Sequence, residues 1–269
     1  MLHNHDVSVA LRIALRVAYL GAGFAGWQRQ RGLRTVQGEL EKAAAALCGG
    51  PVRVVCAGRT DSGVHATGQV CHLDTPVPIP PANVAAALNP LLPPDIRVMR
   101  AWRASPSFHA RRAALGKRYR YRLAWGPVEP WVTQRCWVLP HPPRVADMSE
   151  ALACLPGEHD FAAFALSGHA GTGARGTTRT IFTARLVHRG RRLSVVLEGD
   201  GFLRGMARRI VGALVEVGRG ARPPAWFAEL LGSPTTRPPA PTAPAHGLTL
   251  ERVLYRSNRD QHVLDCPNS

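Results

Sequence analysis

One acidic side chain stands in a polar stretch, punctuated by glycines, that runs from Ala57 to Gln69. Asp61 is the only carboxylate in this stretch, with Arg59 two residues before it and His65 four residues after it. A carboxylate among basic residues suits nucleophilic or general-base chemistry on an anionic substrate. An ordinary turn is the alternative, in which the glycines adopt positive φ and Asp61 bonds its own backbone. The local sequence leaves both interpretations open.

A partner charge for Asp61 can come from far along the chain. The segment 202–217 has an apolar residue at every third or fourth position, which predicts a helix. Arg208 is two residues from Met206 and two from Ile210, so it lies roughly 200° from each and beside the apolar stripe. If that flank faces Asp61, Arg208 would keep the carboxylate charged and oriented. A surface arginine bonded to solvent is the alternative.

The charge balance predicts a polyanionic partner. The 269 residues include 34 Lys+Arg and 18 Asp+Glu, which gives a net charge of +16 and a pI near 11.1. The basic residues are scattered along the chain and not gathered in a tail. This distribution indicates a folded surface that follows phosphates. For any single basic pair the alternative is a solvated face, which a surface that follows phosphates does not exclude.

Several classes of protein are excluded by motifs that the sequence lacks. The six cysteines form no Cys-x-x-Cys pair, and neither a P-loop nor a zinc deaminase signature occurs. The string from Gly21 to Gly26 fits Gly-x-Gly-x-x-Gly but opens no convincing helix. We therefore predict no metal site. Without a signal peptide or a run of about 18 apolar residues, we expect a reduced, cytoplasmic protein that contacts no membrane.

The first half, residues 1–105, is predicted to hold the aspartate loop on mixed strands and helices. Alternation predicts a strand over 9–19, and Thr35 can cap a helix that Gly49 and Gly50 end. The loop 57–69 then lies between two strands. A short helix over 82–88 and a strand over 96–102 complete this half.

The second half, residues 106–269, is predicted to complete the site. A strand over 116–125 places Tyr119 in an aromatic row, which the pattern favours as core over a base-stacking platform, although a tyrosine at the strand's end can be both. Three arginines lie on the other face, where they need water or phosphate. Asp147 and Glu150 have capping-box spacing. The remaining predicted elements are a flexible loop over 167–176, paired strands over 177–188 and 192–198, the helix over 202–217, a helix from Pro223, a proline-rich linker over 233–244 and a last strand over 248–255.

Six motifs in order resemble the A-type tRNA pseudouridine synthase family. The central one is Gly58-Arg59-Thr60-Asp61-x-Gly63-Val64-His65-x-x-Gly68-Gln69-Val70. The others are Gly26-Trp27-Gln28-Arg29-Gln30, Ser107-Phe108-His109-Ala110-Arg111, Lys117-Arg118-Tyr119-Arg120-Tyr121, Phe202-Leu203-x-x-Met206-x-Arg208-x-Ile210-Val211-Gly212 and Ala243-Pro244-Ala245-x-Gly247-Leu248.

The resemblance implies an activity and a set of residues. The reaction would turn uridine into pseudouridine at positions 38 to 40 of the tRNA anticodon stem-loop, without a cofactor or metal. Asp61 would be the catalytic aspartate, Arg208 its partner and Tyr119 the tyrosine that packs on the target base, while Arg59 would help to displace that base. The further residues expected to bind substrate lie in the same motifs: Arg29, His65, Gln69, His109 and Arg111.

The resemblance also implies an α+β fold and a homodimer. Two mixed halves would join through a central, mostly antiparallel sheet with the active cleft between them. The sequence departs from the family pattern at Leu20, where an acidic residue is usual, and at Ala207, where a larger aliphatic is usual. A catalytically silent tRNA-binding or folding protein is the alternative function, which the intact Asp61, Tyr119 and Arg208 disfavour. A synthase that acts on other RNAs stays open.

Overall fold

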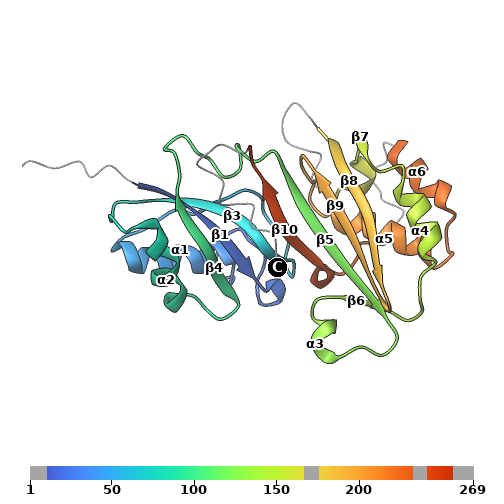
Figure 1. The fold of residues 1–269 in the computed structure, drawn as a ribbon, viewed down its shortest axis with the longest axis horizontal. Helices are drawn as coiled ribbons and strands as arrows, with labels where there is room; N and C mark the ends of the chain where they lie inside the picture. Colours follow the sequence, from blue (N-terminus) through green and yellow to red (C-terminus); the bar gives the residue numbers. More distant parts are fainter. Residues whose placement is uncertain (1–10, 167–175, 233–240, 257–269) are drawn as a thin grey trace, which may run out of the picture.

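The computed structural model describes residues 11–166, 176–232 and 241–256, and its first half is a mixed α/β unit (Figure 1). The predicted loop over 167–176 and the proline-rich linker lie largely outside these ranges. The elements of the first half are β1 (Leu11–Tyr19), a 3₁₀ turn (Gly21–Gly23), α1 (Val36–Cys48), β2 (Val55–Cys56), β3 (His65–Thr75), α2 (Pro81–Leu88), a second 3₁₀ turn (Asn89–Leu91) and β4 (Ile96–Arg103).

The second half is also mixed, and it ends in a strand that returns to the first half. Its elements are β5 (Gly116–Trp125), α3 (Pro130–Thr133), β6 (Trp137–Leu139), α4 (Val145–Leu152), β7 (Gly157–Asp160), a 3₁₀ turn (Ala162–Phe164), β8 (Thr178–Arg189), β9 (Arg192–Gly199), α5 (Met206–Gly218), α6 (Pro224–Gly232), another 3₁₀ turn (Ala245–Gly247) and β10 (Leu248–Leu254).

All strands in the described ranges belong to one sheet of ten strands. Its order is β4-β1-β3-β10-β5-β9-β8-β7, with β2 paired to β3 and β6 paired to β5. Only β10–β3 and β5–β6 are parallel among these pairs. The predicted α+β class with a mostly antiparallel sheet is therefore confirmed.

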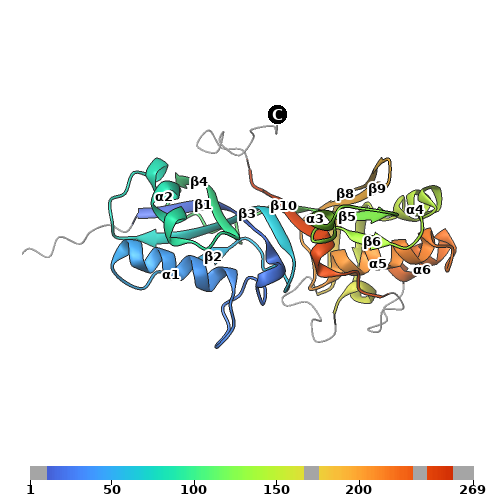
Figure 2. The same ribbon diagram turned by 90° about the horizontal axis from the view of Figure 1, so that it is seen from below.

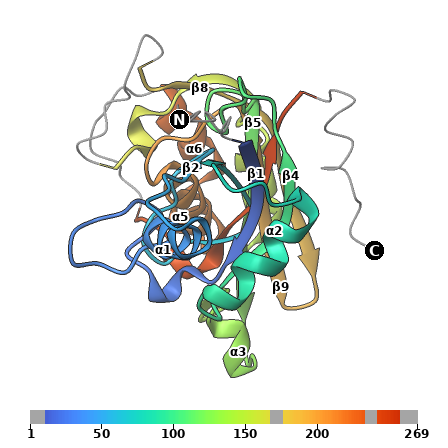
Figure 3. The same cartoon turned by 90° about the vertical axis from the view of Figure 1, so that its left-hand side faces the viewer.

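Helices α1 and α5 cover the same face of this sheet, as the views in Figures 2 and 3 show. The side chain of Thr35 caps α1, because its Oγ1 accepts a hydrogen bond from the Gly38 N–H at 3.3 Å, and Gly49 ends the helix with φ +71°. The cap and the stop agree with the sequence prediction. One apolar cluster, which runs from Ile13 to Val253, fills the space between the helices and the sheet.

Strand β10 joins the two halves, because it pairs with β3 on one side and with β5 on the other. The approach of β10 to β3 depends on Gly68. A Cβ atom at this position would lie 2.0 Å from the backbone oxygen of Glu251 in β10. A division of the chain near residue 105 therefore stays a prediction, since the sheet continues across the boundary.

We expect Gly68→Ala to lower the free energy of unfolding by at least about 2 kcal/mol, because the new methyl group meets backbone that cannot rotate away. Gly50→Ala is the matched control, since a Cβ there meets nothing within 4 Å. Chemical denaturation of both variants measures the difference. Equal stability of the two variants would contradict the view that the pairing of β10 with β3 depends on Gly68.

Three predicted boundaries are wrong. The loop after Ala57 is shorter than predicted, because β3 already begins at His65. The turn interpretation expected positive φ at the glycines of this stretch, but of positions 58, 63 and 68 only Gly63 has it. Helix α4 begins at Val145, with Arg144 as its N-cap and no side-chain cap, so the capping box from Asp147 does not form. Helix α5 begins at Met206, which leaves Phe202 before the helix.

The arginine row of β5 also differs from its prediction. Arg118 forms an ion pair with Glu198 of β9, with 2.6 Å between Nε and Oε2. Arg120 and Arg122 both pair with Glu251 of β10. Neighbouring strands thus supply a counter-charge for each of these arginines, which the sequence had not indicated.

Candidate active site

The Asp61 carboxylate lies between two arginines that come from the other half of the chain. The Arg208 Nη1 is 3.8 Å from Asp61 Oδ2, and the Arg204 Nε is 3.9 Å from Asp61 Oδ1. These separations balance charge but exceed hydrogen-bond length. No side chain or backbone group in the described ranges donates a hydrogen bond to the carboxylate. With 28% of its side chain exposed, Asp61 keeps its acceptor positions open to a ligand.

The turn that carries Asp61 is held by the segment 21–27. The Trp27 N–H donates to the Thr60 carbonyl at 3.1 Å, and the Ser62 hydroxyl donates to the Phe24 carbonyl at 3.0 Å. Gly26, at φ +90°, allows the close approach, since a Cβ would lie 2.9 Å from the Thr60 oxygen. The two segments therefore fix each other beside the site.

Tyr19 supports the same turn from the interior of the protein. Its hydroxyl lies 2.8 Å from Thr60 Oγ1, and its ring packs beside that of Trp27 with centroids 6.0 Å apart. Burial raises the pKa of the Tyr19 hydroxyl, so this group stays neutral and acts as a hydrogen-bonding support.

Arg208 is held rigidly by the segment before β10. Its Nε donates to the Ala243 carbonyl at 2.7 Å, and the Ala243 N–H donates to the Arg208 carbonyl at 3.2 Å. Only 18% of its side chain is exposed, whereas 60% of the Arg204 side chain is. Arg208 is thus the fixed cation of the pair, and Arg204 is the outer one.

Tyr119 projects from β5 toward the same face as α5. Its ring meets the Phe202 ring edge-on, with centroids 4.9 Å apart and an interplanar angle of 75°. Burial raises the pKa of its phenol, and the nearby Tyr19 and Asp61 raise it further. The phenol therefore stays neutral, which suits packing against a base better than proton abstraction.

Two of the residues expected to bind substrate lie inside the protein. His65 is buried, and its Nδ1 accepts a hydrogen bond from the Gly21 N–H at 3.0 Å. Burial lowers the pKa of His65, so its ring is neutral. Gln69 is buried too, and its Nε2 donates to the Gly58 carbonyl at 2.7 Å. Both side chains fix the aspartate turn, and their contact with substrate stays a prediction.

The other expected contacts are on the surface. Arg29 has 70% of its side chain exposed and pairs with Glu41 at 2.9 Å. Arg59 is exposed, and the exposed Arg111 reaches to 4.0 Å from the Cys56 sulfur. His109 is half-buried, and its Nδ1 accepts hydrogen bonds from the backbone N–H groups of Arg111 and Arg112.

Sequence reasoning missed Arg204 and Lys117. Arg204 occupies a position treated as variable within the motif from Phe202 to Gly212, so no sequence signal distinguished it. Lys117 is on the same face of β5 as Tyr119, and its Cε lies 2.6 Å from where a Cβ on Gly58 would be. Burial lowers the pKa of the Lys117 amine. The two-residue spacing from Tyr119 is the signal that could have identified it.

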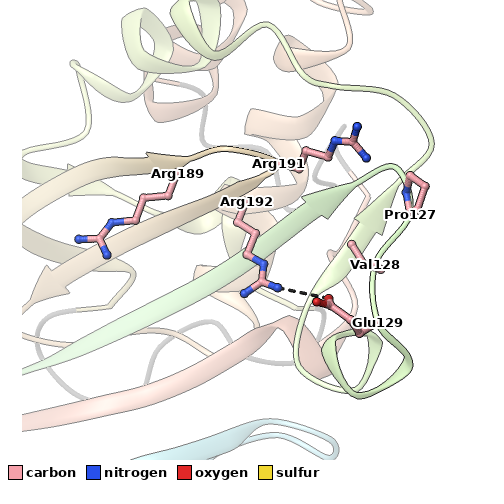
Figure 4. A pocket seen from close by; sticks show the side chains of 6 residues that line it. All are labelled: Pro127, Val128, Glu129, Arg189, Arg191 and Arg192. Atoms are coloured by element: carbon pink, nitrogen blue, oxygen red, sulfur yellow. Dashed lines mark hydrogen bonds and ion pairs between the residues drawn. The ribbon is translucent and has the colours of Figure 1, made fainter.

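A separate cavity of about 520 Å³ lies at the turn between β8 and β9 (Figure 4), and its lining includes neither Asp61 nor the arginines that pair with Asp61. In residues 11–166, 176–232 and 241–256, no group of three or more His, Cys, Asp or Glu side chains could hold a metal. The same ranges contain no helix long and apolar enough to span a membrane.

The fold and the site together define a basic α+β protein with an accessible carboxylate between two cations, a class suited to chemistry on RNA. A family model described as tRNA pseudouridine synthase matches residues 16–111 and 151–256. The chain therefore belongs to the tRNA pseudouridine synthase family. Asp61 and Arg208 fall within the matched segments, and Tyr119 falls between them.

Curated relatives agree with this assignment. The chain is 43% identical over 247 residues to "tRNA pseudouridine synthase A" of Syntrophotalea carbinolica, covering 90% of this chain and 96% of that protein. It is 46% identical over 253 residues to the protein of the same name from Solidesulfovibrio magneticus, covering 91% of each. Against that of Geobacillus kaustophilus, it is 42% identical over 256 residues, covering 94% of this chain and 98% of the relative.

Proposed function

We propose that this protein isomerises uridine to pseudouridine at positions 38 to 40 of the tRNA anticodon stem-loop, with Asp61 as the catalytic carboxylate. The observation that carries the proposal is the placement of Asp61 between Arg208 and Arg204, 3.8 and 3.9 Å away, in a member of this family. An open carboxylate on a strongly basic protein is positioned to meet a ribose whose phosphates are attracted to the same surface.

The reaction keeps every atom of the nucleotide. The N1–C1′ bond breaks, the uracil turns while it stays bound, and C5 bonds to C1′; C5 then loses its proton and N1 gains one. The Asp61 carboxylate would either add to C1′ or remove a proton from C2′, and both routes place its oxygen beside the sugar. Arg208 would hold the carboxylate in place during either step.

Access to the base requires that the target nucleotide leave its stack. Flipping costs a few kcal/mol, which stacking on an aromatic ring and phosphate contacts can offset. Tyr119 would supply the ring, and Arg59 would fill the space that the base leaves. The remaining substrate contacts that we propose come from Arg29, His65, Gln69, His109 and Arg111.

We expect Tyr119→Phe to keep most of the activity and Tyr119→Leu to lose at least about tenfold in kcat/KM, because a packing role needs the ring and not the hydroxyl. Steady-state assays on unmodified tRNA measure both variants. If Tyr119→Phe were as defective as Tyr119→Leu, the hydroxyl would carry the function, and the packing role would be wrong.

The proposed partners are the anticodon stem-loop of tRNA and a second copy of the chain in a homodimer, with the reaction in the cytoplasm. Mapping pseudouridines in unmodified tRNA transcripts after incubation with the purified protein tests the specificity. We expect new pseudouridines only at positions 38 to 40. Modification at other positions would point to another RNA target, and tight tRNA binding without any modification would point to a silent binding protein.

A further inference from the structure

The cavity at the turn between β8 and β9 lies far from the Asp61 site. We call it the hairpin cavity, and its lining is Pro127, Val128, Glu129, Arg189, Arg191 and Arg192 (Figure 4). Strand β5 connects the two places, since Tyr119 is at the site and Trp125 is next to the cavity. Six residues of strand span about 20 Å, so the cavity is about that far from the base-packing tyrosine.

The charges around this cavity are unbalanced. Arg192 pairs with Glu129, with 3.3 Å between Nη2 and Oε2, and both side chains remain about half exposed. Arg189 and Arg191 are exposed and have no ion pair within the described part of the chain. Three arginines and one glutamate thus give the lining a net charge of +2.

The arginines are carried on a fixed turn. Gly190 makes the turn possible with φ +55°, and the Arg191 carbonyl accepts a hydrogen bond from the Trp125 N–H at 3.2 Å. The guanidinium of Arg191 lies over Gly126, because its Nη1 would be 3.3 Å from a Cβ there. Because the backbone of the turn is already held, less backbone entropy is lost when a ligand binds.

We propose that the hairpin cavity binds backbone phosphates of the tRNA, about 20 Å from the nucleotide that is modified. Guanidinium groups match the geometry of phosphate oxygens, and an open, positively charged cavity on a held turn suits a continuous backbone. This inference rests on the proposed function, because a tRNA held at Asp61 brings further phosphates to this end of the sheet at high effective concentration. Glu129 holds Arg192 in position and limits the attraction.

The double substitution Arg189→Gln/Arg191→Gln tests the proposal. We expect it to weaken binding of full-length tRNA about tenfold. The slope of log K against log salt concentration should become shallower by about 1.8, which corresponds to two lost phosphate contacts. KM should rise while kcat stays unchanged, because neither arginine lies near Asp61.

Glu129→Gln is the matched control within the same cavity, and its effect should have the opposite sign. Removal of this carboxylate frees Arg192, so tRNA binding should become tighter. Melting temperatures of all variants check that the fold is retained. An unchanged salt slope in a folded double variant would overturn the proposal.

Two further outcomes separate this proposal from others. If the double variant lost affinity for polyglutamate but kept the salt slope for tRNA, the cavity would serve an acidic peptide and the proposal would be wrong. If the wild-type protein made no pseudouridine but the double variant still showed the shallower salt slope for tRNA, the proposed function would fail while the phosphate contacts would stand.

Discussion

Asp61→Ala is expected to abolish pseudouridine formation, with a rate loss of at least about 10⁴-fold, while tRNA affinity stays within several-fold of wild type. Asp61 supplies the carboxylate that lies between Arg204 and Arg208, whereas the phosphate contacts that we propose come from other residues. Release of tritium from C5-labelled uridine in tRNA measures the rate, and filter binding measures the affinity.

Asp61→Asn is the closer control, because it keeps the size of the side chain and removes only its charge and basicity. We expect it to be as inactive as Asp61→Ala and to melt within a few degrees of wild type. The Val64 N–H bonds the backbone carbonyl of residue 61 and not its side chain, so the turn should survive either change. Turnover of either variant at a rate comparable to wild type would remove Asp61 from its assigned role.

Arg208→Ala should have the second largest effect, a loss of about 10²-fold in kcat, because the carboxylate loses its fixed cation. Arg204→Ala should cost less, since that arginine is 60% exposed and water screens its charge. Single-turnover assays at saturating enzyme separate the chemical step from binding. Equal losses for the two variants would contradict the difference in burial on which the prediction depends.

Arg208 also has a structural bond, which the test must separate from its charge. Its Nε donates to the Ala243 carbonyl, so Arg208→Ala can loosen the segment before β10. Arg208→Lys keeps the positive charge but cannot reproduce that bond together with the contact to Asp61. We expect Arg208→Lys to recover part of the rate. Recovery of thermal stability without recovery of rate would mean that a cation alone is not what Asp61 needs.

Local periodicity predicted much of the fold. The alternation along 9–19 and 116–125 predicted strands β1 and β5, and it placed the buried face of β5 correctly, because successive strand residues point to opposite sides whatever the partner is. Thr35 and Gly49 marked the ends of α1, since a cap depends only on residues within one turn. The arginines of β5 were mispredicted because their partners are distant, with glutamates from β9 and β10. The capping box at Asp147 failed although its signal is local, since α4 begins two residues earlier, at Val145.

The sequence by itself determined the chemistry that is possible: one carboxylate in a polar loop, a basic chain, no metal-binding motif, and ordered motifs that match one family. Only the tertiary structure decided which groups meet Asp61. It brought Arg204 to the site beside Arg208, buried His65 and Gln69 beneath the turn, and placed β10 between the two halves. The physical reason is that spacing along a chain fixes the faces of a strand or helix, whereas contacts between elements depend on strand order and register, which packing of the whole core selects.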